Sequence, residues 1–206
     1  MTRVVGRDFV FGPPEKEKFR AFMRMYENFS GCRVLAYCLM CNHIHILLEV
    51  PPMPAGGLTD AELLKRLRAI YSEAEVAVVE RRLAEVRLAI AEGRADESLA
   101  AEIHERFTYR MHDLGEYLKT LLGRFTRWFN GSHERTGTLW EGRFKSVLVE
   151  AGVAARAMAA YIVDEIFNAC RERFGARRKD GVRAPRGRAS PAKGVLWSAR
   201  DLKVRL

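Results

Sequence analysis

Two histidines separated by a single residue, His43 and His45, form the first pattern in this sequence that could do chemistry. Because alternate residues of a β-strand point to the same face, both imidazoles are expected to project from one side of a strand while Ile44 and Ile46 enter the core. Two neutral imidazoles can hold a divalent metal ion and leave positions for phosphate oxygens and water. The residues alone leave two interpretations open: a metal site that acts on phosphodiesters, or two half-exposed strand residues.

Two cysteines precede this pair in the order Cys38-x-x-Cys41-x-His43-x-His45, which suggests a zinc site. Four ligands within eight residues would have to wrap one ion while two of them lie on a regular strand, whereas zinc fingers usually separate their ligand pairs by a longer loop. This spacing disfavours a zinc site. A zinc-stabilised structural protein is the third interpretation, after the two above.

Tyr161 is the next candidate, because of its place on a helix expected over residues 153–174. At 100° per residue, the apolar side chains of this helix fall between about 100° and 240° from Tyr161, whereas Glu165 falls about 40° from it. The phenol thus lies outside the apolar stripe, either as an ordinary boundary residue or as a nucleophile held toward a substrate. As a nucleophile with a pKa near ~10 it would need a metal or a base nearby.

A segment from Arg135 to Ser146 combines two glycines with alternating basic residues. Arg143 and Lys145 suit contact with a nucleic-acid backbone. Trp140 suits either stacking on a base or burial in a tight turn.

The elements expected to position these residues begin with two antiparallel strands, over residues 33–40 and 43–50, around a tight turn at Cys41-Asn42. A helix is predicted before them over residues 15–29. Another is predicted from about Asp113 to a cap at Asn130-Gly131, with one broad apolar face and with Arg124 and Arg127 off it.

Three further elements complete the expected α+β fold, in which helices pack on an antiparallel sheet. Residues 59 to about 106 are predicted to form a long helical pair, opened by a capping box at Thr59-x-x-Glu62. A strand is predicted over residues 144–150, and the helix over residues 153–174 follows it.

The basic residues of the chain are unevenly distributed. The 206 residues include 35 Lys and Arg against 26 Asp and Glu, and the whole excess lies in residues 171–206, where twelve basic residues meet three acidic ones. With Gly and Pro between them, these residues predict either a flexible arm that binds phosphates or a solvated tail. We therefore divide the chain into a domain over residues 1–170, with a helical insertion at about 59–110, and a basic C-terminal arm over residues 171–206.

Composition excludes several classes of protein. A hydrophobic content of 48% and a charged content of 30% are typical of a folded chain. Because no run of ~18 uncharged apolar residues occurs and no signal core follows Met1, we expect a cytosolic protein without membrane contact. The four cysteines are too few and too clustered for a disulfide framework and are expected to be thiols. Collagenous, mucin-like and disulfide-stapled classes are excluded.

Taken together, these stretches resemble the REP-associated tyrosine transposases, single-tyrosine members of the HUH nuclease group. Residues 37–47, Tyr-Cys-Leu-Met-Cys-Asn-His-Ile-His-Ile-Leu, resemble the strand motif of the family, and residues 137–146, Gly-Thr-Leu-Trp-Glu-Gly-Arg-Phe-Lys-Ser, resemble its signature. Tyr161 follows that signature at the distance of the family tyrosine. The resemblance covers nearly the whole chain.

The resemblance implies a ferredoxin-like antiparallel sheet with packed helices, in which His43 and His45 bind Mg or Mn and the metal polarises a phosphate of single-stranded or hairpin DNA. It implies that Tyr161 attacks phosphorus, giving a 5′-phosphotyrosine link and a 3′-OH. Such chemistry needs no ATP or nicotinamide, and the sequence has neither a P-loop nor a Gly-x-Gly-x-x-Gly turn. The implied DNA-binding residues are basic or aromatic: Arg124, Arg127, Arg135, Trp140, Arg143, Lys145 and the C-terminal arm.

The sequence departs from the family pattern in two places. After Tyr161, a Leu-Asn-Pro-Val-Arg-Ala-like run is replaced by Val163-Asp-Glu-Ile-Phe-Asn, which suggests an in-frame internal deletion. Glu165 stands where the family often supplies an Asn or Gln ligand, and we expect its carboxylate to take that role. Relatives also carry a first strand just before the segment that matches residues 2–5, and most of that strand is missing here, which an upstream start codon would explain.

We therefore expect a metal-dependent single-strand DNA transposase or nickase. The alternative is a catalytically decayed relative that only binds nucleic acid. The oligomeric state stays open.

Overall fold

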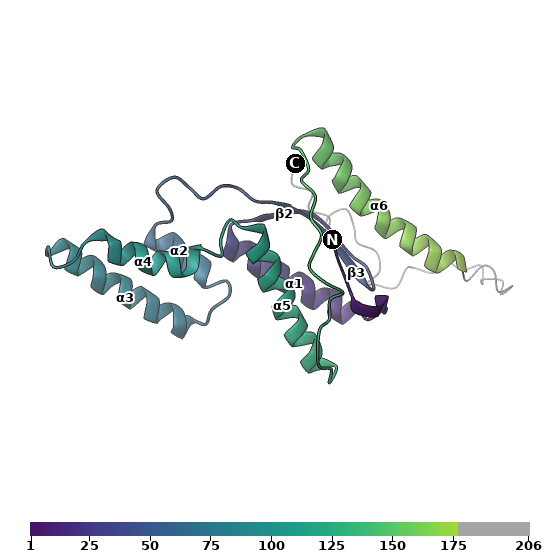
Figure 1. Ribbon diagram of the computed structural model, residues 1–206, viewed down its shortest axis with the longest axis horizontal. Coiled ribbons are helices and arrows are strands. Elements are labelled where there is room, and N and C mark those ends of the chain that lie inside the picture. Colours follow the sequence, from purple (N-terminus) through teal and green to yellow (C-terminus); the bar gives the residue numbers. More distant parts are fainter. Residues whose placement is uncertain (177–206) are drawn as a thin grey trace, which may run out of the picture. The chain divides into compact units, whose positions relative to one another are not determined.

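The computed structural model describes the backbone of residues 1–176 and the side chains of residues 1–164. Its elements run in the order β1 (Thr2–Arg3), the 3-10 helix η1 (Val5–Arg7), α1 (Pro13–Ser30), β2 (Arg33–Leu39), β3 (His43–Glu49), α2 (Asp60–Leu67), α3 (Glu73–Ala91), α4 (Glu97–Thr108), α5 (Leu114–Ser132) and α6 (Val153–Ala176) (Figure 1). Within this range the fold is mixed α+β, as predicted.

Two compact units make up the chain, and each is described by itself. The first comprises Met1–Lys16, Val34–Leu48 and the segment from Gly137 onward, and the second comprises Glu17–Arg33 and Glu49–Thr136. The histidine pair and Tyr161 both belong to the first unit.

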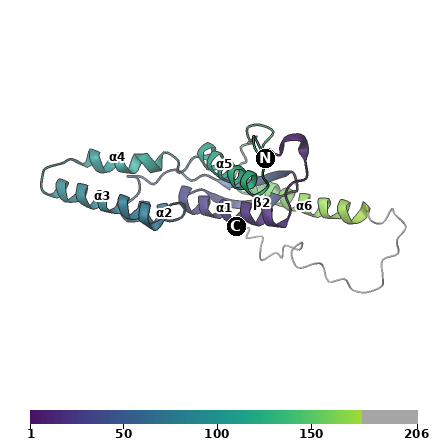
Figure 2. The same ribbon diagram turned by 90° about the horizontal axis from the view of Figure 1, so that it is seen from below.

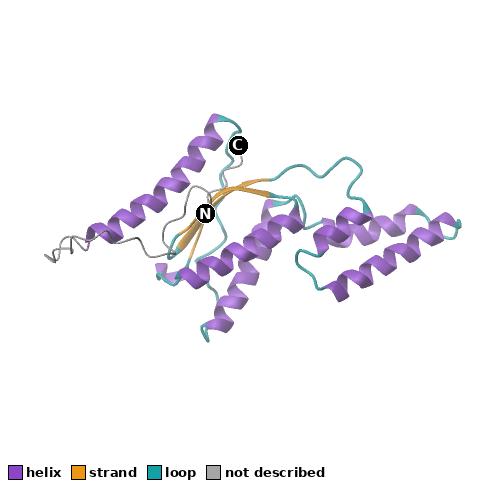
Figure 3. Ribbon diagram, turned by 180° about the vertical axis from the view of Figure 1, so that it is seen from behind, coloured by secondary structure: helices purple, strands orange, loops and turns teal. Residues whose placement is uncertain are grey.

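The sheet of the first unit is antiparallel and has the strand order β1-β3-β2 (Figure 3). Thr2 pairs with Ile44 and Arg3 with His43, so β3 is the central strand. The predicted hairpin is confirmed, with a turn over Met40–Asn42 that is one residue longer than expected. The turn is closed by the backbone N–H of Met40, which donates to the carbonyl of His43 (2.9 Å).

The strand predicted over residues 144–150 is wrong. Instead, residues 139–145 run antiparallel along the side of β1 away from β3, with an isolated bridge between Val4 and Trp140. Three backbone N–H groups donate across this contact: Val5 to the carbonyl of Leu139 (3.0 Å), Glu141 to that of Arg3 (2.9 Å) and Lys145 to that of Met1 (2.9 Å).

The physical reason is that the apolar residues after Lys145 have no strand partner among the described residues. Val147 and Leu148 are accordingly 83% and 99% exposed. β-propensity alone does not make a strand without a backbone to pair with.

In the second unit, α1 and α5 pack through aromatic side chains. The rings of Phe19 and Phe125 lie 5.0 Å apart, edge to face. The hydroxyl of the buried Tyr117 donates to the carbonyl of Met23 (3.2 Å). Both helices are predicted by their apolar spacing, because the residues that recur at helical intervals are those that become buried.

The ends of these two helices differ from the prediction by a few residues. α1 begins at Pro13, since the fixed φ of proline suits the first turn of a helix. α5 begins as predicted, because the Asp113 side chain accepts a hydrogen bond from the N–H of Glu116 (2.7 Å). However, α5 continues through Gly131 to Ser132 and ends on His133. The predicted cap at Asn130-Gly131 is therefore wrong.

The helical insertion contains three helices, α2, α3 and α4, and the predicted pair is therefore wrong. Of the predicted capping box, one half is present: Thr59 Oγ1 accepts from the N–H of Glu62 (3.3 Å), whereas Oε1 of Glu62 accepts from Nη2 of Arg66 (3.2 Å). A second cap follows at Ser72, whose backbone and side chain exchange hydrogen bonds with Glu75 in a full capping box. α3 and α4 then lie side by side (Figure 2).

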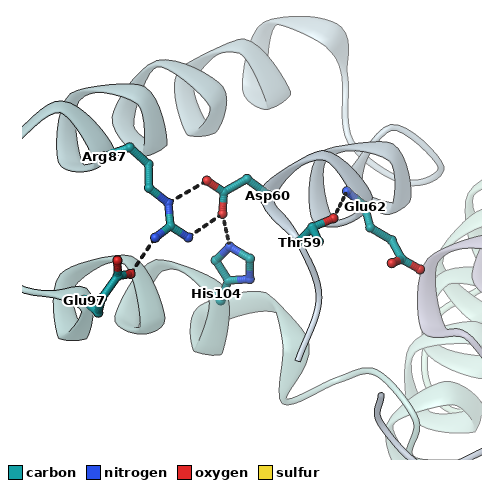
Figure 4. A network of polar contacts seen from close by, with 6 residues as sticks. All are labelled: Thr59, Asp60, Glu62, Arg87, Glu97 and His104. Carbon is teal, nitrogen blue, oxygen red and sulfur yellow. Dashed lines mark hydrogen bonds and ion pairs between the residues drawn. The ribbon is translucent and has the colours of Figure 1, made fainter. Parts of the chain in front are cut away.

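A polar network joins the three helices of the insertion (Figure 4). Asp60, at the start of α2, accepts hydrogen bonds from Nε and Nη2 of Arg87 on α3 (2.8 and 2.9 Å). The same carboxylate lies 2.8 Å from Nε2 of His104 on α4. These bonds hold the pKa of Asp60 down at about 2, chiefly through Arg87.

α6 extends from Val153 to Ala176, close to the prediction of residues 153–174. Of the helices in the described part of the chain, none has the length and apolar character needed to cross a bilayer.

Candidate functional site

His43 and His45 project together from β3, as predicted. Their ring centres lie 5.2 Å apart, with the planes at 78° to each other. Ile44 between them is 2% exposed, whereas Ile46 is only partly buried. Because a bond from a metal ion to an imidazole nitrogen is about 2.1 Å long, two rings on one ion have centres roughly 5 Å apart. The separation of the two imidazoles therefore fits a shared ion.

Asn42 holds His43 in place from the turn before β3. Its Oδ1 lies 2.7 Å from Nδ1 of His43. Its Nδ2 donates to the carbonyl of Arg7 (3.0 Å). That carbonyl is presented by η1, in which Gly6 and Arg7 both have left-handed backbones, with φ of 69° and 61°. The glycine makes this tight turn accessible, since left-handed conformations are disfavoured for residues with a Cβ.

Among the described side chains, no further His, Cys, Asp or Glu joins the histidine pair in a metal-binding group. No group of three or more His, Cys, Asp or Glu residues within them is arranged to hold a metal ion. The side chain of Glu165, the predicted third ligand, lies outside the described residues, although its backbone belongs to α6.

The zinc interpretation receives no support from the same region. Cys38 is buried on β2, and Sγ of Cys41 lies 3.8 Å from Nζ of Lys16. Neither joins the two histidines in a cluster that could hold a metal ion, within the residues described. Cys32, Cys38 and Cys41 are unbridged thiols, as predicted, and the side chain of Cys170 lies outside the described residues.

Tyr161 lies on the exposed side of α6. It is 54% exposed, while its neighbour Ile162 is 3% exposed and Ala159, two residues earlier, is also buried. The predicted position of the phenol outside the apolar stripe is therefore confirmed. An exposed phenol can reach a large substrate such as a DNA strand, which a buried one could not.

Three of the predicted DNA-binding arginines belong to the second unit. Arg124 stacks its guanidinium over the ring of Phe22 (5.2 Å), and Arg135 lies over the ring of Phe129 (5.7 Å). Arg127 is exposed on α5. Each of the three is partly or fully accessible to solvent and so to a phosphate.

The other predicted DNA-binding residues belong to the first unit. The ring of Trp140 packs against Phe11, 5.8 Å away, which favours a structural role. Arg143 and Lys145 are exposed beyond it. Of the basic arm, residues 171–176 continue α6, and residues 177–206 lie outside the described residues.

Lys18 and Asn42 are two residues that the sequence analysis did not single out. The ammonium of Lys18 lies over the rings of Phe22 (5.1 Å) and Trp128 (5.7 Å), beside Arg124 on the same face of α1 and α5. The spacing of four between Lys18 and Phe22 could have predicted the first contact. No local pattern predicts the contact of Asn42 with Arg7.

Comparisons with protein-family models, with curated proteins and with solved structures give no match to this chain.

Proposed function

We propose that the protein is a metal-dependent transposase or nickase that cleaves single-stranded hairpin DNA through a 5′-phosphotyrosine intermediate. The observation that carries this proposal is the pair of imidazoles of His43 and His45, 5.2 Å apart on one face of β3. Two neutral imidazoles on a rigid strand form a chelating pair, and they leave coordination positions for a substrate.

A ferredoxin-like sheet is part of the proposal. The order β1-β3-β2, with segment 139–141 on the other side of β1, corresponds to the order 4-1-3-2 of such a sheet if this segment takes the place of the fourth strand. The antiparallel bridge between Val4 and Trp140 supports that reading. In this arrangement the histidines lie on a central strand, where backbone pairing on both sides restricts their motion.

His43 and His45 are the residues that would hold Mg or Mn, with the Glu165 carboxylate as the expected third ligand. Such an ion supplies Lewis-acid polarisation of a phosphate oxygen. The Tyr161 oxygen would attack phosphorus and release its proton to a base or to water. The bond from phosphorus to the 3′ oxygen breaks, and that oxygen leaves with the electron pair and takes up a proton. The 5′-phosphate stays on the tyrosine.

Binding of the DNA would rest on cations that are partly or fully accessible to solvent. Lys18 and Arg124 lie over the same ring of Phe22 in the second unit, where Arg127 is also accessible on α5, and Arg143 and Lys145 belong to the first unit. Cations of this kind neutralise phosphates without reading sequence, so they supply affinity for a strand and not specificity for a particular hairpin. The basic residues of the arm over residues 171–206 would add to this sequence-independent affinity.

A second candidate function is binding of nucleic acid without cleavage. The observation that favours it is the lack of a three-ligand group around His43 and His45 among the described side chains. Two imidazoles alone hold Mg or Mn weakly, because these ions prefer oxygen ligands. The identity of the third ligand therefore separates the two functions.

An adduct assay with hairpin oligonucleotides and Mn tests the proposal. The wild-type protein should give a protein–DNA species that resists denaturant, and Tyr161→Phe and His43→Ala should abolish it. Tyr109→Phe is the matched control, because Tyr109 is also exposed, at 65%. Binding without an adduct in any divalent metal would favour the second function.

A further inference from the structure

The side chain of Asn42 makes two hydrogen bonds, and the chemistry of its partners fixes which end of the amide makes each one. Its amide contacts the carbonyl of Arg7 at 3.0 Å and Nδ1 of His43 at 2.7 Å. A carbonyl oxygen can only accept, so the NH2 group of the amide must face Arg7. The amide oxygen must therefore face His43.

This orientation decides which ring nitrogen of His43 carries the proton. The amide oxygen also only accepts, so Nδ1 must be the N–H that donates to it. In a neutral imidazole the other nitrogen, Nε2, then carries the lone pair. A metal ion binds a ring nitrogen only through a lone pair, so the orientation of one amide selects the ligand atom.

We propose that Asn42 is a positioning residue for His43, which it holds as the Nδ1–H tautomer so that Nε2 is the metal-binding nitrogen. The metal in this statement rests on the proposed function, whereas the tautomer does not. Hydrogen bonds of this kind to the second nitrogen of a ligating histidine orient the ring and raise its basicity.

The surroundings of Asn42 explain why its amide is held in one orientation. Its own carbonyl accepts from the N–H of Val4 (2.8 Å), and the carbonyl of Cys41 accepts from the N–H of Phe11 (2.9 Å). The N–H of Arg7 in turn donates to the carbonyl of Val4 (3.1 Å). The turn before β3 and the segment over residues 4–11 thus fix each other, and the amide does not need to be ordered when a ligand binds.

Nitrogen-15 NMR of the histidine side chains in the full-length, metal-free protein tests this directly, at a pH at which the rings are neutral. His43 should appear as the Nδ1–H tautomer in the wild type. In Asn42→Ala it should become a mixture that includes Nε2–H, while His45 in the same spectrum serves as an internal reference. Asn28→Ala, at an exposed position of α1, is the matched control and should leave His43 unchanged.

Two outcomes would overturn the proposal. His43 would be found as Nε2–H in the wild type, a result that needs no variant to fold. Alternatively, Asn42→Ala would keep the pure Nδ1–H tautomer, which would mean that another group sets it.

Titration with Mn²⁺ alone, followed by the EPR signal of the unbound ion, tests the selected ligand atom. Asn42→Ala should weaken Mn²⁺ binding by roughly 10–100-fold, and Asn28→Ala should leave it unchanged. Unweakened binding by Asn42→Ala would contradict the role of Asn42 in presenting Nε2 of His43 to the metal. A wild-type protein with the Nδ1–H tautomer and no Mn²⁺ binding would support the role of Asn42 and refute the metal-dependent function.

Discussion

Nη1 of Arg66 lies 3.0 Å from Nε2 of His112, in the space left by the missing side chain of Gly31. Nδ1 of the same histidine lies 2.8 Å from the carbonyl of Pro51. Since this carbonyl accepts, Nδ1 donates and Nε2 accepts from the guanidinium. The cluster ties together three parts of the second unit that are distant in sequence.

We expect Gly31→Ala to be strongly destabilising. A Cβ at this position would lie 2.6 Å from Nε2 of His112, and the backbone φ is +76°. Strain and displacement of Arg66 together should lower the free energy of unfolding by roughly 2–4 kcal/mol, measured by urea unfolding. Gly57→Ala is the control, because Gly57 has a φ of +78° and nothing within 4 Å of its Cβ. It should cost only about 1 kcal/mol. Equal losses would contradict the role of the cluster.

Tyr117 should make stability depend on alkaline pH. Burial, helped by the charge of Glu27, raises the pKa of Tyr117 well above its usual value. Below the unfolded-state pKa of about 10 the phenol is neutral in both states, so its contribution is fully present. Above that pH only the unfolded chain releases the proton, and the free energy of unfolding should fall by about 1.4 kcal/mol per pH unit.

Tyr117→Phe should remove this slope and should cost about 1 kcal/mol at neutral pH, because the hydrogen bond to Met23 is lost. Urea unfolding of both proteins on either side of pH ~10 measures the difference. Parallel pH profiles would show that the buried phenol does not ionise on unfolding.

Asp60 should make the free energy of unfolding fall as the solution becomes more acidic. Its folded-state pKa of about 2, set first by Arg87 and then by His104, lies below the unfolded value. The stabilisation is therefore present above pH ~4 and is lost as the pH falls toward ~2.

Since the Asp60 carboxylate is partly exposed, Asp60→Asn should cost only about 1 kcal/mol near neutral pH, and less at pH ~3. Glu85→Gln is the control, because Glu85 forms an exposed pair with Arg82 on α3. If the difference in free energy of unfolding between wild type and Asp60→Asn stayed constant from neutral pH to pH ~3, the ionised network of Asp60 would be excluded as the source of that difference.

Substitution of Arg143 should affect DNA binding alone, whereas substitution of Trp140 should affect the stability of the fold. Arg143→Ala should weaken binding to single-stranded DNA and lower the slope of log affinity against log salt by about 0.7, with unfolding unchanged. Trp140→Ala should lower the free energy of unfolding by about 2 kcal/mol, because the ring packs on Phe11. Trp140→Phe should recover part of that loss. The reverse pattern would mean that Trp140 stacks on a base.

Much of the fold follows from local patterns in the sequence. α1 and α5 have long apolar repeats at helical spacing, which predict the two helices. The hairpin has two apolar runs around a short turn, which predict its two strands. The predicted pair lacks the break between α2 and α3 because residues 68–71 contain neither Gly nor Pro. The capping box at Ser72 and Glu75 was its signal.

One part of the candidate site could be predicted from the sequence, and another part could not. The shared face of His43 and His45 follows from the period of a strand and could be predicted. The contact of Asn42 with Arg7 spans 35 residues and depends on a left-handed turn at Gly6-Arg7, so no local rule predicts it. The strand predicted over residues 144–150 is wrong for a related reason, since a strand needs a pairing partner that no local pattern identifies.

The attachment site of DNA on the protein tests the central claim most directly. The wild-type protein is incubated with a hairpin oligonucleotide and Mn, digested with protease and nuclease, and analysed by tandem mass spectrometry. We predict a nucleotide 5′-phosphate on the phenol of Tyr161. Attachment at another residue, such as Tyr109, or cleavage of the DNA without any attached nucleotide would contradict the account.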